Sequence, residues 1–172
     1  MKYLPSENLT FDFSYNIRYS LLDDEKLPGV AAIKEIKSRI LKGQVKYNLN
    51  ENLALLTRID YKIADPGASK GMLLLQDLVY SFRHLPVELW IRYCLFNTDD
   101  WNSRLYTYEN DMLYSFSIPA LSGRGTRSYI MAKWEIGDLA ELRIKYALTS
   151  LSSDNNLSAE KDEVKLQFRI WF

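Results

Sequence analysis

The side chains that could carry acid–base chemistry are few and scattered along this 172-residue chain. His84 is the single histidine, and the sequence His84-Leu85-Pro86 predicts a tight turn. A Ser-His-Asp arrangement needs its histidine beside a nucleophile and a carboxylate. The sequence around His84 indicates no such set, so we expect an exposed turn residue there.

Glu109 and Asp111 form a second candidate site, because two neighbouring carboxylates can separate their pKa values and share acid–base work. The pair lies within a long run of mixed residues from Trp101 to Ile118. A turn at Glu109-Asn110-Asp111, or an ion-paired interior, explains the pair without any catalysis. We favour that structural interpretation.

The remaining candidates predict neither a metal site nor a cofactor. Cys94 is the only cysteine, so it has no partner for an internal disulfide or a thiolate metal site. The carboxylates of Asp65 and Asp99-Asp100 lack the ligand pattern of a calcium loop. Gly123-Arg124-Gly125 is too short for a phosphate-binding loop and predicts a turn. The sequence therefore shows no enzymatic signature.

The elements that must position these residues show a two-residue periodicity. From Leu9 to Leu21 the odd positions are apolar and the even positions are polar. Successive side chains of a strand point to opposite faces, so the pattern predicts strands with one apolar and one polar face. The pattern recurs in residues 53–63, 87–95, 140–148 and 164–172, and more loosely in 72–82 and 127–136. We predict an all-β, antiparallel protein.

Turn residues divide the chain into strands, and most long connections alternate with short ones, as in barrels of the bacterial outer membrane. The predicted connections lie near residues 21–32, 49–52, 64–70, 84–86, 97–101, 119–125, 137–138 and 150–161. With a further turn at Glu109-Asn110-Asp111, the chain would be a transmembrane β-barrel of about ten strands, an even number; the alternative is a fragment of about nine. We treat residues 1–172 as a single domain, either a whole barrel or the C-terminal portion of one.

Charge on the polar faces indicates a barrel interior filled with ion pairs. The predicted network comprises residues of both signs: Arg58, Asp60, Glu88, Arg92, Glu141, Arg143, Lys145 and Arg169. Opposite charges can pair across strands inside a closed lumen. A soluble lipocalin-like barrel that binds an apolar ligand would show the same period with the opposite polarity, and this alternative stays open.

Aromatic residues and the C-terminal sequence favour the membrane alternative. Tyr and Trp suit a boundary between lipid and water, and they are expected in two belts on the apolar faces: Tyr15, Tyr19, Tyr47, Tyr61, Tyr80, Tyr93, Tyr106, Tyr108, Tyr146 and Trp134. Phe168, Ile170 and Phe172 alternate up to the last residue. They are similar to the C-terminal signal that the barrel-assembly machinery of outer-membrane proteins reads.

Composition excludes other classes. The net charge is zero, which gives no footprint for nucleic acid. The longest uncharged run, residues 112–123, is far shorter than the roughly 20 apolar residues of a spanning helix. The residues after Met1 contain no apolar region of a signal peptide. Because an outer-membrane protein must be exported, we expect a fragment of a longer chain.

The stretch from Arg92 to Pro119, RYCLFNTDDWNSRLYTYENDMLYSFSIP, resembles Bacteroidetes outer-membrane proteins that carry an N-terminal helix-hairpin-helix region and a large C-terminal barrel. Gly123-Arg124-Gly125, Arg127-Ser128-Tyr129 and the closing strand resemble the same group. The resemblance implies that this chain is the last portion of a longer barrel. It transfers no catalytic residue and no role of the absent helical region.

The expected function is that of a structural anchor, or of a channel or transport wall with a charged lumen, in the outer membrane of a Gram-negative bacterium. The expected partners are the lipid bilayer, the barrel-assembly machinery and the missing N-terminal part of a longer chain, and not nucleic acid. Mixed charge argues against strong ion selectivity, since selective pores use rings of one sign. A barrel enzyme acting at the outer surface is a further, less favoured alternative.

Overall fold

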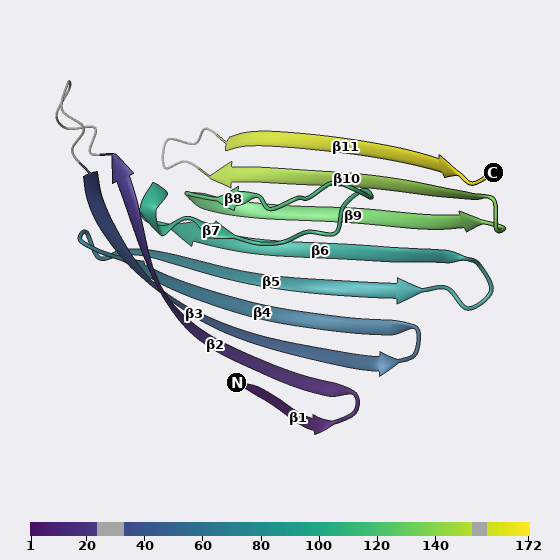
Figure 1. Ribbon diagram of the computed structural model, residues 1–172, viewed down its shortest axis with the longest axis horizontal. Helices are drawn as coiled ribbons and strands as arrows, with labels where there is room; N and C mark the ends of the chain where they lie inside the picture. Colours follow the sequence, from purple (N-terminus) through teal and green to yellow (C-terminus); the bar gives the residue numbers. More distant parts are fainter. Residues whose placement is uncertain (24–32, 153–157) are drawn as a thin grey trace.

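The structure is a computed structural model that describes residues 1–23, 33–152 and 158–172 (Figure 1). Long strands dominate it, which confirms the all-β prediction. The central parts of the predicted connections 21–32 and 150–161 lie outside the described residues. The elements are β1 (Lys2–Ser6), β2 (Leu9–Asp23), β3 (Ile33–Asn50), β4 (Leu53–Ala64), β5 (Ser69–Ser81), β6 (Val87–Thr98), the 3-10 helix η1 (Trp101–Ser103), β7 (Leu105–Tyr106), β8 (Ala120–Leu121), β9 (Arg124–Ile136), β10 (Ala140–Ser152) and β11 (Ser158–Ile170).

One antiparallel sheet of nine strands forms the body of the molecule, in the order β1-β2-β3-β4-β5-β6-β9-β10-β11. Each strand pairs with its neighbour in sequence, except that β6 pairs directly with β9. The short β7 and β8 form a separate two-stranded ladder. The connection between β6 and β9 therefore leaves the sheet and returns to it.

Local sequence explains the tight turns. The side chain of Asn50 accepts hydrogen bonds from the backbone N–H groups of Asn52 (2.8 Å) and Leu53 (2.9 Å), which closes the turn between β3 and β4. Gly137, between β9 and β10, has a φ of 57° that glycine adopts at little cost. The connection predicted near residues 64–70 joins β4 to β5 and contains Asp65-Pro66-Gly67.

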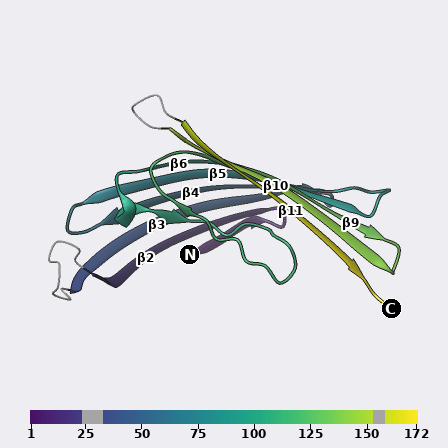
Figure 2. The same ribbon diagram turned by 90° about the horizontal axis from the view of Figure 1, so that it is seen from above.

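The sheet is curved (Figure 2), and its two faces differ in the side chains that they carry. Most polar residues of the strands lie on the concave face, where many are buried beneath the β6–β9 connection. Most apolar residues lie on the convex face and are exposed there, for example Ile17 (47%), Ile144 (46%) and Leu166 (67%), whereas Leu73, Leu75 and Phe96 are buried on the concave side under the connection. This is the polarity that the alternation predicts for a charged interior, and it is the inverse of a soluble β-barrel with an apolar core.

The described strands do not close into a barrel, because β1 and β11 are the two edges of the sheet. An odd number of strands in antiparallel order gives edges that run in the same direction, as the arrows of β1 and β11 show in Figure 1. β1 pairs with only the first part of β2, up to Asp12. Phe13 still exchanges hydrogen bonds with Met1, and the rest of β2 has no partner on its outer side among the described residues.

The prediction of two strands between Trp101 and Ile118 is wrong. This region contains η1, the two residues of β7 and an isolated bridge between Glu109 and Ser117. The chain turns at Met112–Ser115, where Ser115 N–H donates to the carbonyl of Met112 (3.1 Å), and not at Glu109-Asn110-Asp111. The predicted count of ten strands is therefore also wrong. The sheet has nine strands, and β1 takes a place that the sequence did not predict.

Three further predictions differ from the structure. Tyr106 and Tyr108 do not belong to the apolar face of the sheet, because they lie on the β6–β9 connection above its concave face. Only Gly123 of Gly123-Arg124-Gly125 forms the predicted turn, with a φ of 84°, since Arg124 and Gly125 begin β9. The last strand ends at Ile170, two residues before the predicted end at Phe172.

Gly71 in β5 allows the β6–β9 connection to approach the sheet. A Cβ atom at this position would lie 2.2 Å from the backbone oxygen of Ser103, which is completely buried. Only glycine permits such a contact without displacement of one of the two backbones. A Cβ atom on Gly43 in β3, by contrast, would meet nothing within 4 Å.

We therefore expect Gly71→Ala to lower the free energy of unfolding by roughly 1–3 kcal/mol, the usual cost of overpacking. Gly43→Ala is the matched control, since it adds the same methyl group in open space and should change stability little. Urea unfolding in detergent micelles measures both. Equal effects of the two substitutions would contradict close packing of the connection on β5.

Candidate functional site

The β6–β9 connection, residues 99–123, is named here the inserted segment. Its ends are held together, because Thr98 N–H donates to the carbonyl of Gly123 and Gly123 N–H donates to the hydroxyl of Thr98, each at 2.8 Å. Asp100 caps η1 by accepting from the backbone N–H groups of Asn102 (2.8 Å) and Ser103 (3.0 Å). The segment then crosses the concave face (Figure 2).

Hydrophobic packing holds the base of the inserted segment, which comprises residues 99–107 and 120–123. Leu105 and Leu121 are each 2% exposed. They pack in one cluster with four residues of β5 and β6: Leu73, Leu75, Cys94 and Phe96. The remainder, residues 108–119, is named the tip, and it contributes no member to the hydrophobic clusters of the described residues.

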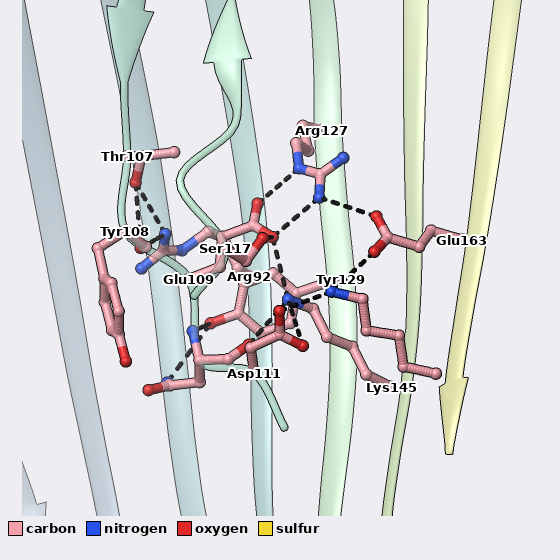
Figure 3. A network of polar contacts seen from close by, with 12 residues as sticks. Arg92, Thr107, Tyr108, Glu109, Asp111, Ser117, Arg127, Tyr129, Lys145 and Glu163 are labelled. Atoms are coloured by element: carbon pink, nitrogen blue, oxygen red, sulfur yellow. Dashed lines mark hydrogen bonds and ion pairs between the residues drawn. The ribbon is translucent and has the colours of Figure 1, made fainter. Parts of the chain in front are cut away.

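Charge contacts hold the tip instead, and Glu109 lies at their centre (Figure 3). Its carboxylate is fully buried and accepts two hydrogen bonds from Arg127 of β9, at 2.6 Å and 2.9 Å. Lys145 of β10, only 1% exposed, donates to the same carboxylate at 3.1 Å. Ser117 donates from the other arm of the tip at 3.2 Å. A bidentate arginine contact of this kind fixes orientation as well as charge.

Asp111 attaches the tip to the last strand. Its carboxylate accepts from Lys165 of β11 at 2.6 Å and lies 3.8 Å from Lys145. Lys145 and Lys165 stand directly opposite each other in the β10–β11 ladder. Like charges in this position destabilise a sheet. Asp111 lies between them and compensates their repulsion, so the inserted segment supplies the anion that the sheet lacks.

Arg92 of β6 holds the point where the base passes into the tip. Its guanidinium binds Asp77 of β5 (2.6 Å for Nη2 to Oδ2) and donates to the hydroxyl of Thr107 at 2.8 Å and to the carbonyl of Tyr108. Tyr129 lies beneath, with its ring centroid 5.4 Å from Arg92 and 4.7 Å from Lys145. Cations and aromatic faces attract each other in such geometry.

The surroundings of the two carboxylates keep them ionised. Burial alone would favour the neutral acid of Glu109, but the hydrogen bonds and charges of Arg127 and Lys145 outweigh it and lower the pKa. For Asp111 burial likewise opposes ionisation, and the contact with Lys165 and the backbone N–H of Met112 lower its pKa. Carboxylates held ionised in this way are suited to ion pairing with Arg127, Lys145 and Lys165.

All the charged residues that were predicted to form one lumen network lie on the concave strand faces, but they form several separate groups. Arg58 and Asp60 pair with each other, and Lys42 lies 3.6 Å from Asp60. Glu88 contacts Lys133 (3.5 Å). Glu141 pairs with Arg143 (2.8 Å), whereas Arg169 stacks on Trp171. Arg92 and Lys145 are the two members that reach the inserted segment.

The sequence interpretation missed Arg127 and Asp77 as members of the site. Arg127 lies on the same face as Tyr129 and Lys133, so strand parity could have placed it on the concave side. No sequence pattern could bring Glu109 beside it, because the contact spans 18 positions and depends on a segment that leaves the sheet. Asp111 was considered as a member of a turn or of an ion-paired interior, but the sequence did not indicate Lys165 as its partner.

The other candidates remain separate from this site. His84 is exposed in the connection between β5 and β6. Cys94 is buried in the hydrophobic cluster beneath the base of the segment. Within the described part of the chain, no group of three or more His, Cys, Asp or Glu side chains could hold a metal ion. No helix there has the length and apolar character needed to cross a membrane.

Comparisons with protein-family models, with curated proteins and with solved structures find no match to this chain. The concave network and the exposed convex face are therefore the observations from which a function must be inferred.

Removal of one partner from the buried cluster should be costly. We expect Glu109→Gln to lower the free energy of unfolding by about 3 kcal/mol, because it leaves Arg127 and Lys145 without their shared anion. Glu135→Gln is the control, since Glu135 pairs with Lys133 but is half exposed, and its loss should cost less than about 1 kcal/mol. Denaturant unfolding in micelles compares them, and equal costs would contradict the structure.

The pH dependence of stability follows from the same two carboxyls. Their pKa values are lowered by folding, so their contribution is complete above the ordinary values of 4.5 and 3.8 and is lost as the pH falls through the lowered values. We expect the wild-type protein to lose stability below about pH 4 more steeply than Glu109→Gln. Unfolding free energies measured from pH 7 to pH 3 test this, and parallel profiles would be inconsistent with it.

Proposed function

We propose that this chain is a non-catalytic wall of a bacterial outer-membrane β-barrel, serving as an anchor whose lumen is narrowed by the inserted segment. The single observation that carries the proposal is the inverted polarity of the sheet, apolar outside and charged inside. Its site of action would be the outer membrane of a Gram-negative bacterium, as the sequence resemblance to Bacteroidetes proteins implies.

The convex face fits lipid better than water. Exposed apolar residues follow one another along the strands; on the described strands they include Phe11, Phe13, Tyr15, Ile17, Ile59, Tyr61, Ile91, Tyr93, Ile130, Trp134, Ile144, Tyr146, Val164, Leu166 and Phe168. Soluble monomers rarely expose continuous apolar patches of more than a few hundred Å². Most of the sheet strands contain 12 to 18 residues, more than the roughly 9–11 that a tilted strand needs to cross a bilayer.

The concave face favours an anchor over an open channel. The inserted segment covers β9 to β11 there. Its buried carboxylates form ion pairs with basic residues of these strands. Selective channels line their pores with one sign of charge or with ordered carbonyl groups. A network of acidic and basic residues that binds a segment of the same chain to the sheet fills the space above the sheet and makes the wall more rigid. This supports a structural role.

The two sheet edges support the prediction that the chain belongs to a longer one. Backbone groups in lipid must all be paired, so an open sheet is not a viable membrane structure. Because β1 and β11 run in the same direction, an all-antiparallel barrel needs an odd number of further strands between them. We propose that a preceding part of the same polypeptide supplies these strands and also covers the unpaired half of β2.

The C-terminal residues support the proposed assembly route. Phe168 and Ile170 point to the convex face and are 57% and 47% exposed, and Phe172 is fully exposed after the end of β11. We propose that these three residues bind the barrel-assembly machinery before the strand is inserted. The lipid bilayer is the second proposed partner, and nucleic acid is not one.

Two neighbouring substitutions distinguish a lipid-facing surface from one facing water. Phe13→Lys places a charge on the convex face, where Phe13 stands opposite Gly43, and Asn16→Lys places the same charge on the concave face of the same strand. In a bilayer, Phe13→Lys should cost roughly 2–4 kcal/mol and reduce insertion into phosphatidylcholine vesicles, whereas Asn16→Lys should not. Flotation of vesicles with refolded protein measures the inserted fraction.

The soluble lipocalin-like alternative makes the opposite prediction. It would leave the wild-type protein monodisperse in buffer without detergent and absent from the floated vesicles, with no difference between the two lysine variants. That result would overturn the membrane proposal.

A further inference from the structure

We propose that Arg127, Lys145 and Lys165 form an anion-binding site on the concave face, in which Glu109 and Asp111 of the tip are built-in occupants. When the tip lifts, this site takes a soluble phosphate-type oxyanion. The inference goes beyond the wall function and does not require it, since every group involved lies on the concave face.

The cations come from the sheet and the resident anions come from elsewhere. Arg127, Lys145 and Lys165 belong to the neighbouring strands β9, β10 and β11, whose ladder fixes their spacing. Glu109 and Asp111 belong to the tip (Figure 3). Without the tip, three positive charges would face the carboxylate of Glu163, which lies 3.8 Å from Arg127 and 2.9 Å from Lys165. The residues that the sheet itself contributes to the site therefore carry a net positive charge.

The donor set matches a multivalent oxyanion. Arg127 presents two N–H groups to one carboxylate, which is also the geometry in which guanidinium binds phosphate. The two lysines add point charges, and the hydroxyl of Thr149, which accepts from Arg127 at 2.7 Å, fixes the orientation of the guanidinium. A single ion that takes the place of both carboxylates matches their charge when it carries at least two negative charges.

The tip can leave without unfolding the base. Leu105 and Leu121 pack the base into the hydrophobic cluster, whereas the tip is held by charge contacts and by Gln167, which exchanges two hydrogen bonds with the backbone of Leu113. At the far end of the tip, Tyr114 is 91% exposed and has a φ of 62°, a conformation that side-chain-bearing residues rarely adopt. A competing anion must break these polar contacts and expose Met112, the one residue of the tip that is both hydrophobic and buried (8% exposed).

Removal of the resident carboxylates should unmask the site. We expect the full chain with Glu109→Gln and Asp111→Asn, in detergent micelles, to bind inorganic pyrophosphate in isothermal titration calorimetry at least about tenfold more tightly than wild type, because the internal competitor is gone. Addition of Lys145→Met to this variant should abolish the gain. No tighter binding by the double variant overturns the proposal.

The matched control is Glu88→Gln with Glu135→Gln, which removes the same number of negative charges beside Lys133 on the same face. This control should leave pyrophosphate binding unchanged. An equal gain in binding would show attraction by net charge alone and would overturn the proposal.

Wild-type protein provides a test that does not depend on folding of the variants. Pyrophosphate should speed hydrogen exchange at the amide of Leu113, which donates to Gln167 in the closed tip, relative to sodium chloride at the same ionic strength. Unchanged exchange at saturating pyrophosphate would overturn displacement of the tip. Vesicle insertion plays no part in either measurement, so failure of the membrane proposal would appear separately.

Discussion

The concave side of this protein depends on the contact between Glu109 and the two cations Arg127 and Lys145. These three side chains are 0%, 6% and 1% exposed, so each charge has been removed from water and needs the others. An isolated buried charge is costly, and a buried pair is acceptable only with close geometry and further hydrogen bonds. Ser117, Thr149 and the carbonyl of Asn110 supply those bonds. The path of the whole inserted segment follows from this requirement.

The charge of the sheet explains why such a segment is needed. Lys145 faces Lys165 across β10 and β11, and Lys133 faces Arg143 across β9 and β10. Strands with these registers would repel one another if the concave face held nothing else. Glu88 and Glu135 neutralise Lys133, and Glu141 neutralises Arg143, from within the sheet. Near β11 the sheet provides too few acidic residues, and the tip provides the rest.

Alternation along the strands was enough to predict the sheet, because one face of each strand had to be apolar and the other polar. It placed Arg58, Glu141 and Lys145 on the correct face and located most strand ends within a few residues. It failed in residues 101–118 because the inserted segment alternates too. Leu105, Thr107 and Glu109 point to the sheet and are buried, whereas Tyr106 and Tyr108 point away and are exposed. A chain that lies over a sheet has the same two-faced pattern as a strand within one.

The wrong prediction for residues 101–118 did not change the predicted directions of the other strands. The two strands predicted between Trp101 and Ile118 were lost together, so the direction of β9, β10 and β11 relative to β6 is the one that the sequence predicted. The inserted segment leaves β6 and enters β9 at one end of the sheet, which is also the end of the connection between β4 and β5. The tight turns after Asn50 and Ile136 lie at the opposite end. The inserted segment is the longest of the described connections, and it is folded inward because Glu109 and Asp111 find their counter-charges on the concave face.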